Sequence, residues 1–142
     1  MIEKDTNNTM NDPFFESLSP TDFKSTVDRI SKEVVNKSWS IMHIYDLQET
    51  LKKHGKEVLP ATVLSICQPK HSSRILEKDT ERIVSTMMPC RISVYEKNDG
   101  KCYISRINPS IMTPFYGGII EEVMSESAHE VEEIIEQVLR VK

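Results

Sequence analysis

The chain has 142 residues, of which 28% are charged and 38% are hydrophobic, and its formal net charge is −4. This length suits one domain with a core of its own, and the mild negative charge argues against nucleic acid as the main partner. No stretch approaches the roughly 18 apolar residues of a membrane-spanning helix, and the polar N-terminus lacks a signal-peptide core. We therefore expect a cytoplasmic protein without a membrane or nucleic-acid partner, whose three cysteines are not a disulfide framework.

The N-terminal part of the chain predicts a polar tail followed by a strand and a helix. Residues 1–11 have no apolar period and are predicted to be a disordered tail, whereas residues 12–142 are predicted to form a single α+β domain. A short strand is expected over residues 13–18. Ser19 and the proline and aspartate that follow it are typical of a helix start, with Ser19 as the cap. Apolar residues at steps of four and three continue this helix to Val34.

The middle of the chain predicts two further strands around a short helix. Residues 39–45 alternate in polarity, which indicates a strand and places His43 on the same face as its tryptophan. Asp46 is the expected cap of a short helix. Residues 62–67 are apolar and β-branched, as in an inner strand, and Pro69 is expected to end that strand because proline cannot donate to the ladder.

The next segment predicts helical structure and then a β-hairpin. Residues 71–88 are expected to be helical in one or two pieces, with Ser72 or Ser73 capping the first. Residues 91–96 and 101–107 are predicted strands, joined by an Asn-Asp-Gly turn whose residues tolerate positive φ.

A helix is predicted at the C-terminal end. Ser127 and Glu130 have the spacing of a capping box, and an apolar stripe runs from there to Leu139. The glutamates of this region, Glu121 and Glu132 among them, are interpreted as solvent-facing. The whole pattern predicts an α+β fold, a mostly antiparallel sheet of about five strands packed against helices.

Two cysteines stand where apolar runs meet prolines, as Cys67 with Pro69 and Cys90 with Pro89. Each thiol is therefore expected at the tip of a strand, where folds carry chemistry more often than at strand centres. If the two strands are antiparallel neighbours, both thiols lie at the same end of the sheet, and if they are parallel a joint role within one chain fails. The sequence leaves both arrangements open.

Each of these residues also has an interpretation without function. Cys102 is expected in the core, because free cysteine often packs as a small hydrophobe. Cys67 and Cys90 could pack in the same way. For His71 a solvated loop histidine is the alternative to a ligand, and for His43 it is a half-buried histidine with one hydrogen-bond partner.

From about residue 14 to residue 139 the chain resembles the family named domain of unknown function 302. The resemblance is carried by Ile66-Cys67-Gln68-Pro69, Met88-Pro89-Cys90-Arg91, Val94-Tyr95-Glu96, Asp99-Gly100 and Asn108-Pro109. The family usually has Asn at the positions of Gln68 and Arg91, so this sequence departs from it beside both cysteines. The resemblance implies an α+β fold that tends to pair as a homodimer, and it implies no known reaction.

Three functions are compatible with these patterns, and no motif identifies a cofactor. A homodimeric binding protein would hold a small molecule or a soft metal near Cys67 and Cys90. The residues that would complete or support such a site are His43, His71, Pro69, Pro89, Gln68 and Arg91. A thiol-dependent enzyme would need a cation near a cysteine, such as Arg91, Lys70 or His71. A structural or regulatory interaction module would use the cysteines for packing alone.

Overall fold

The structure is a computed structural model that describes residues 12–111 and 113–140. The predicted tail, residues 1–11, lies outside the described residues. The elements in chain order are β1 (Phe14–Leu18), α1 (Phe23–Asn36), β2 (Ser40–Asp46), α2 (Leu47–Lys52), β3 (Ala61–Cys67), α3 (Pro69–Leu76), the 3₁₀ helix η1 (Glu81–Met87), β4 (Cys90–Glu96), β5 (Cys102–Ile107), the short 3₁₀ helices η2 (Pro109–Ile111) and η3 (Thr113–Phe115), and α4 (Gly118–Leu139).

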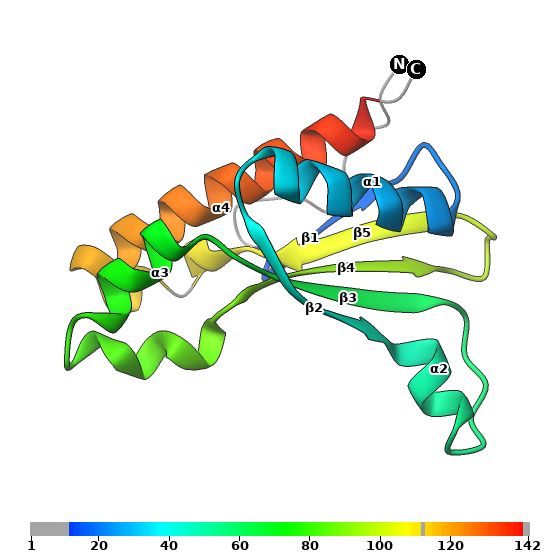
Figure 1. Cartoon of the computed structure of the whole chain (residues 1–142), viewed down its shortest axis with the longest axis horizontal. Coiled ribbons are helices and arrows are strands. Elements are labelled where there is room, and N and C mark those ends of the chain that lie inside the picture. The colour runs from blue at the N-terminus through cyan, green and yellow to red at the C-terminus, as the bar shows by residue number, and fades with distance from the viewer. Residues whose placement is uncertain (1–11, 112, 141–142) are drawn as a thin grey trace.

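The five strands form one antiparallel sheet in the order β1-β5-β4-β3-β2 (Figure 1). This confirms the predicted α+β class. β4 and β5 are the expected hairpin, and Gly100 in its turn has a φ of 78°, a conformation that costs glycine little. β3 lies inside the sheet between β4 and β2, and none of its residues is exposed, which explains its apolar sequence.

Helices α1 and α4 lie across one face of the sheet and bury the core against it (Figure 1). Residues Ile30 of α1, Leu64 of β3, Ile104 of β5 and Ile134 of α4 are fully buried there. Burying each such side chain stabilises the fold by about 1.5–3 kcal/mol relative to leaving it exposed. Cys102 belongs to this core, as the sequence predicted.

Asp46 caps α2 as predicted, by accepting a hydrogen bond from the backbone N–H of Glu49, but the starts of the other three α-helices differ from those predicted. Asp22 caps α1 by accepting a hydrogen bond from the backbone N–H of Ser25, whereas Ser19 is buried and shares a hydrogen bond with Thr26 at 2.6 Å. α3 begins at Pro69, so the predicted caps Ser72 and Ser73 are wrong, because both lie inside the helix.

α4 begins at Gly118, nine residues before the predicted start at Ser127. Ser127 is buried in the middle of the helix and faces the sheet side, so the apparent capping box is a coincidence of spacing. Gly117 and Gly118 stand at the start of the helix, both with positive φ. Among the described residues, every helix is too short or too polar to span a bilayer.

Candidate functional site

The two proline-flanked cysteines lie at the same end of the sheet. β3 and β4 are antiparallel neighbours, and Ile66 is the register partner of Cys90. Cys67 follows Ile66 as the last residue of β3, and Cys90 is the first residue of β4. The sequence left the relative direction of these strands open, and the antiparallel pairing satisfies the condition for a shared site. Both cysteines are half-buried free thiols.

A small hollow connects the cysteines to His71. Its volume is about 30 Å³, which is room for roughly one or two water molecules. Cys67, Cys90 and His71 line it together with Gln68 and Pro89. The fold thus brings these five predicted site residues to one place.

His71 is not the solvated loop histidine that the sequence suggested. It lies in α3 and exposes only 4% of its surface. Its Nε2 lies 2.6 Å from Oε2 of Glu130, which projects from α4. The other carboxylate oxygen of Glu130 accepts a hydrogen bond of 2.9 Å from Nε1 of Trp39. One carboxylate therefore links α3, α4 and the segment before β2.

The interpretation of Glu130 as a solvent-facing residue is accordingly wrong. Burial opposes its ionisation, but the hydrogen bonds from Trp39 and His71 outweigh burial and lower the pKa of Glu130. Glu130 is therefore a carboxylate at neutral pH, and Nε2 of His71 carries the proton that it donates. Nδ1 of His71 lies 3.7 Å from Oε2 of Glu126, too far for a hydrogen bond.

The thiol of Cys90 is in an environment that disfavours the thiolate. Burial, with a smaller contribution from the neighbouring Cys67, raises the pKa of Cys90 to about 11. Cys90 is therefore a neutral thiol near pH 7, and the neutral thiol is neither the nucleophile nor the metal-binding form of cysteine.

Gln68 and Pro69 shape the end of β3 where it turns into α3. The Gln68 side chain accepts a hydrogen bond from the backbone N–H of Lys70 and donates one of 3.0 Å from Nε2 to the carbonyl of Ser38. Pro69 is the first residue of the helix, a position that suits its fixed φ and missing N–H. Gln68 thus holds this loop against the turn before β2, although it differs from the usual Asn of the resembled family.

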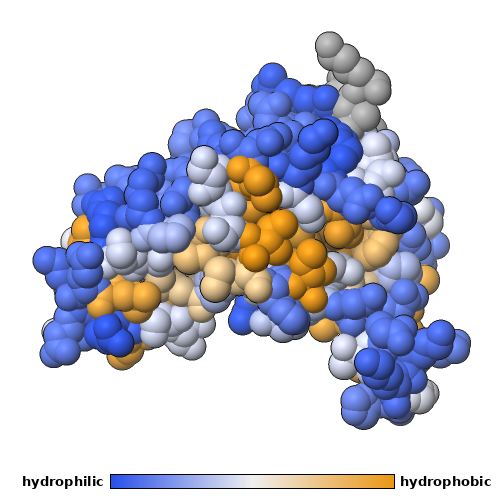
Figure 2. Space-filling view, in the orientation of Figure 1, coloured by the Kyte–Doolittle hydropathy of each residue, from blue (hydrophilic) through white to orange (hydrophobic). Residues whose placement is uncertain are grey.

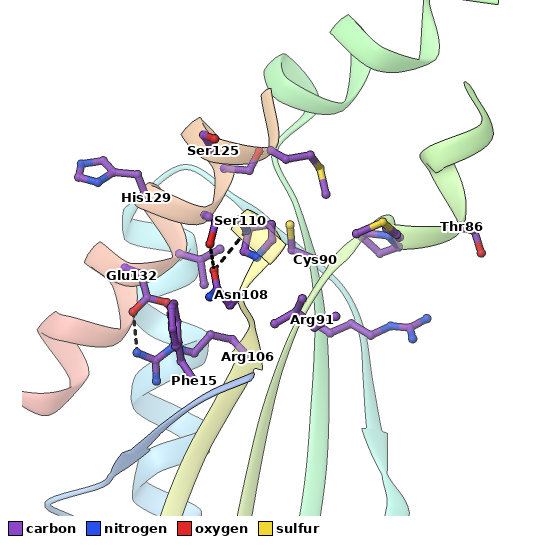
Figure 3. A pocket seen from close by; sticks show the side chains of 18 residues that line it. Phe15, Thr86, Cys90, Arg91, Arg106, Asn108, Ser110, Ser125, His129 and Glu132 are labelled. Carbon is purple, nitrogen blue, oxygen red and sulfur yellow. Dashed lines mark hydrogen bonds and ion pairs between the residues drawn. The ribbon is translucent and has the colours of Figure 1, made fainter. Parts of the chain in front are cut away.

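A larger cavity of about 410 Å³ opens on the other side of Cys90 (Figure 3). β1, β4, β5, η1, η2 and α4 all contribute to its wall. The wall is mostly apolar and includes Phe15, Met87, Pro89, Ile107, Met124 and Val131. Cys90 and Ser127 line both this cavity and the small hollow, so the two spaces share a wall.

Paired polar groups lie at one end of the cavity (Figure 3). Arg106 is buried and donates to both carboxylate oxygens of Glu132, at 2.8 Å from Nε and 2.5 Å from Nη2. Asn108 accepts hydrogen bonds from the backbone N–H and the hydroxyl of Ser110. Glu132 was predicted to face solvent; its side chain is 39% exposed and also neutralises a buried arginine, because a buried charge without a partner is costly.

The structure separates His43 and the Arg91 guanidinium from the cysteines. His43 is exposed on β2, with its ring 4.4 Å from that of Tyr45, and lines neither space. A bulge between Ile41 and His43 turns these residues to opposite faces, so the predicted shared face with the tryptophan is wrong. Arg91 is exposed at the cavity wall, and its guanidinium points away from Cys90 (Figure 3).

Within residues 12–111 and 113–140, no group of three or more His, Cys, Asp or Glu residues is arranged to hold a metal ion. Zinc and other soft metals need three or four such ligands. The Cys67–Cys90 end of the sheet therefore does not offer a complete set from one chain.

The comparisons with known proteins identify the family. The model of the family described as domain of unknown function DUF302 matches residues 15–141. The chain belongs to the DUF302 family. Its fold is similar to the crystal structure of an uncharacterized conserved DUF302 protein from Bacillus stearothermophilus, with a TM-score of 0.79 and 17% identity. That similarity covers 89% of this chain and 98% of the other. Comparison with the curated proteins gives no match.

Sequence reasoning missed several residues that build this candidate site of the DUF302 protein. Glu130 was interpreted as part of a capping box, and Glu132 and Arg106 were unremarkable, because a charged residue on a surface helix or strand normally faces water. One signal was available: Glu130 and Glu132 flank Val131 within the apolar stripe of α4, at the border of its buried face. The residues on other elements that Glu130 and Glu132 contact could not be predicted from the positions of the two glutamates in the helix.

Proposed function

We propose that this protein binds a small, largely apolar molecule in the 410 Å³ cavity beside Cys90. The volume lies in the range of about 300–1,000 Å³ that is usual for ligand pockets. The observation that carries the proposal is an apolar cavity at the end of the sheet whose wall includes Pro89 and Cys90. These two residues belong to one of the two cysteine-proline motifs on which the family resemblance rests.

The polar groups of the wall favour a neutral ligand. Arg106 is held by Glu132 and Asn108 by Ser110. The other arginine of the described lining, Arg91, is exposed and points its guanidinium away from Cys90 (Figure 3), so these contacts favour a ligand without a strong negative charge. A ligand with an apolar body and one hydrogen-bonding group near Ser127 or Ser110 fits this lining best.

The same observations weigh against the two other chemistries. A thiol-dependent enzyme needs a thiolate, and burial raises the pKa of Cys90 well above neutral pH. A soft-metal site would need ligands beyond those that the described residues of one chain assemble. As part of the same proposal we place the protein in a reducing compartment such as the cytoplasm, supported by three free cysteines.

The test uses N-phenyl-1-naphthylamine, a neutral fluorescent probe of suitable size, titrated into the purified full-length protein. We expect binding of one probe per chain in the micromolar range. Ala128→Phe adds a ring to the cavity wall from α4 and should weaken binding by at least tenfold. Saturating probe should also slow alkylation of Cys90 by iodoacetamide, followed by mass spectrometry.

Glu136→Phe is the matched control, because Glu136 is exposed on the same helix and does not line the cavity. It should leave probe affinity within about twofold of the wild type. The absence of binding to the wild type, or equal affinity in the Ala128→Phe variant, would overturn the proposal.

A further inference from the structure

The face of the sheet opposite α1 and α4 carries a row of polar side chains. β2, β3 and β4 are adjacent strands, and their register makes Ser65 the partner of His43 on one side and of Arg91 on the other. Ser65 stands between the core residues Leu64 and Ile66, so its side chain and this row point away from the core helices. Three polar side chains from three strands therefore stand side by side, and the backbones of the outer two are about 10 Å apart.

The two faces of β2 differ in their chemistry. Ile41 and Ile44 lie on the helix side of the strand, and Figure 2 shows an apolar strip that crosses the region of β2 from the end of α1 toward α2. On the opposite side β2 presents His43 and Tyr45, whose ring centroids lie 4.4 Å apart. Both residues are exposed, so this face offers an imidazole and a flat aromatic surface to a ligand.

Ser65 occupies the centre of the row with an unpaired hydroxyl. It exposes only 2% of its surface, and within residues 12–111 and 113–140 its Oγ makes no hydrogen bond. A buried hydroxyl without a partner destabilises a fold, and alanine would avoid that cost. Such a group calls for an explanation, and a ligand that accepts its hydrogen bond provides one.

Arg91 brings a positive charge to the same place. It is exposed and forms neither an ion pair nor a hydrogen bond with the described residues. In Figure 3 its side chain extends from β4 across β3, and the guanidinium points away from Cys90. An unpaired guanidinium therefore lies on the side of β4 where Ser65 is its neighbour.

No carboxylate of the neighbouring strands competes for this charge. Asp46 of β2 and Glu96 of β4 pair with Thr62 and Cys102, which places both acids on the helix side of the sheet. Glu16 of β1 is on the open face, but it lies two strands from β4 and is bound by Lys97 at 2.8 Å. The row thus presents hydrogen-bond donors without an acidic neighbour, although the whole chain has a net charge of −4.

We propose that Arg91, Ser65 and His43 bind an oxyanion, namely the phosphate or carboxylate group of a small aromatic compound. The planar guanidinium of Arg91 holds two oxygens of the anion as a fork. The hydroxyl of Ser65 donates to the oxygen that faces the sheet, and the imidazole of His43 closes the far side of the site. The ring of the ligand lies against Tyr45, which continues the aromatic surface beside His43.

This site is separate from the 410 Å³ cavity of the proposed function. α4 contributes much of the cavity wall and lies on the other face of the sheet. Arg91 lines the cavity as well, but its guanidinium points away from Cys90 (Figure 3). A neutral apolar ligand in the cavity and an aromatic anion on the open face therefore use different groups.

The experiment is an NMR titration of the ¹⁵N-labelled full chain with phenyl phosphate, phenylacetate and the neutral benzyl alcohol. We expect at least one of the two anions to bind with a dissociation constant of about 1 mM or below, and the tighter one identifies the anionic group. The shifted amides should be those of residues 43–45, 63–65 and 91–93. Benzyl alcohol should bind about tenfold more weakly, since it lacks the charge that Arg91 holds.

Two variants and a control assign the affinity to the row. Arg91→Gln should weaken binding of the anion by about tenfold. Ser65→Ala should weaken it by about threefold and leave the urea midpoint unchanged or higher, because it removes an unpaired buried hydroxyl. Lys101→Gln, at an exposed position of the hairpin turn, changes the net charge equally and should keep the affinity within about twofold.

The proposal is overturned by any of four results. These are no saturable shift with either anion at about 20 mM, wild-type affinity in Arg91→Gln or Ser65→Ala, benzyl alcohol binding as tightly as the anions, and shifts centred on α4. The last result would place the anion in the cavity instead. Failure of the open-face site would leave the binding of a neutral probe in the cavity unaffected, so the two proposals fail separately.

Discussion

Glu130 is the residue that connects the most parts of this site. Its two oxygens accept hydrogen bonds from the indole of Trp39 and the imidazole of His71, so one side chain positions the wall of the hollow beside Cys67 and Cys90. Hydrogen bonds to a charged group stabilise a protein more than neutral ones do, and leaving a buried donor unpaired costs more still.

Replacing Glu130 with Gln should therefore destabilise the protein by about 1–2 kcal/mol, since the amide keeps one acceptor but presents an N–H group to one of two donors. Urea unfolding, followed by the fluorescence of the single tryptophan Trp39, measures this difference. Glu136→Gln, in an exposed pair with Arg140, should change stability by less than about 0.5 kcal/mol. A Glu130 variant as stable as this control would show that the network is dispensable.

The pKa of Glu130 gives this prediction a pH dependence. The folded pKa lies below the ordinary value of 4.5, so the unfolded state takes up the proton first as pH falls. The stabilisation by ionised Glu130 is then complete above the unfolded value and is lost as pH falls through the folded one. The gap in unfolding free energy between wild type and Glu130→Gln should narrow below about pH 4.5.

At the scale of elements, the sequence predicted strands better than helix starts. The hairpin and the apolar β3 have short-range signals, namely a turn that needs glycine and a run of β-branched residues. Helix starts depend on which of several polar residues reaches a backbone N–H. Ser127 looks like a cap only until its burial in the middle of α4 is known.

The start of α4 is fixed by backbone conformation instead. Gly117 has φ 61° and ψ −162°, a region that residues with a side chain rarely enter. Gly117→Ala should cost about 1–3 kcal/mol in unfolding free energy by backbone strain alone, because a Cβ there would meet no atom within 4 Å. Ser125→Ala, at an exposed position of the same helix, serves as the control in urea unfolding. A Gly117→Ala variant with unchanged stability would mean that the helix start tolerates another conformation.

For the whole molecule, the family and the antiparallel sheet could be predicted from the sequence, whereas the candidate site could be predicted only in part. The prolines mark where the two strands end, so the places of Cys67 and Cys90 at the tips of β3 and β4 could be predicted. The partners that surround them come from α4, more than thirty residues later, and nothing local reports such contacts. His43 was misplaced for the same reason, since a bulge is set by strand pairing.

If two copies of the chain pair as a homodimer, as the resemblance to the family implies, the stability of the whole molecule must depend on its concentration. Each unfolding event then also dissociates the dimer into two chains, so dilution favours the unfolded state by mass action. For a chain of 142 residues, the usual unfolding entropy per residue predicts a rise in Tm of about 2 °C for each tenfold increase in concentration. Scanning calorimetry or tryptophan fluorescence between 1 and 100 µM should thus show a shift of about 4–5 °C for the wild type. A constant Tm in the wild type would mean that the folded chain does not depend on a second copy.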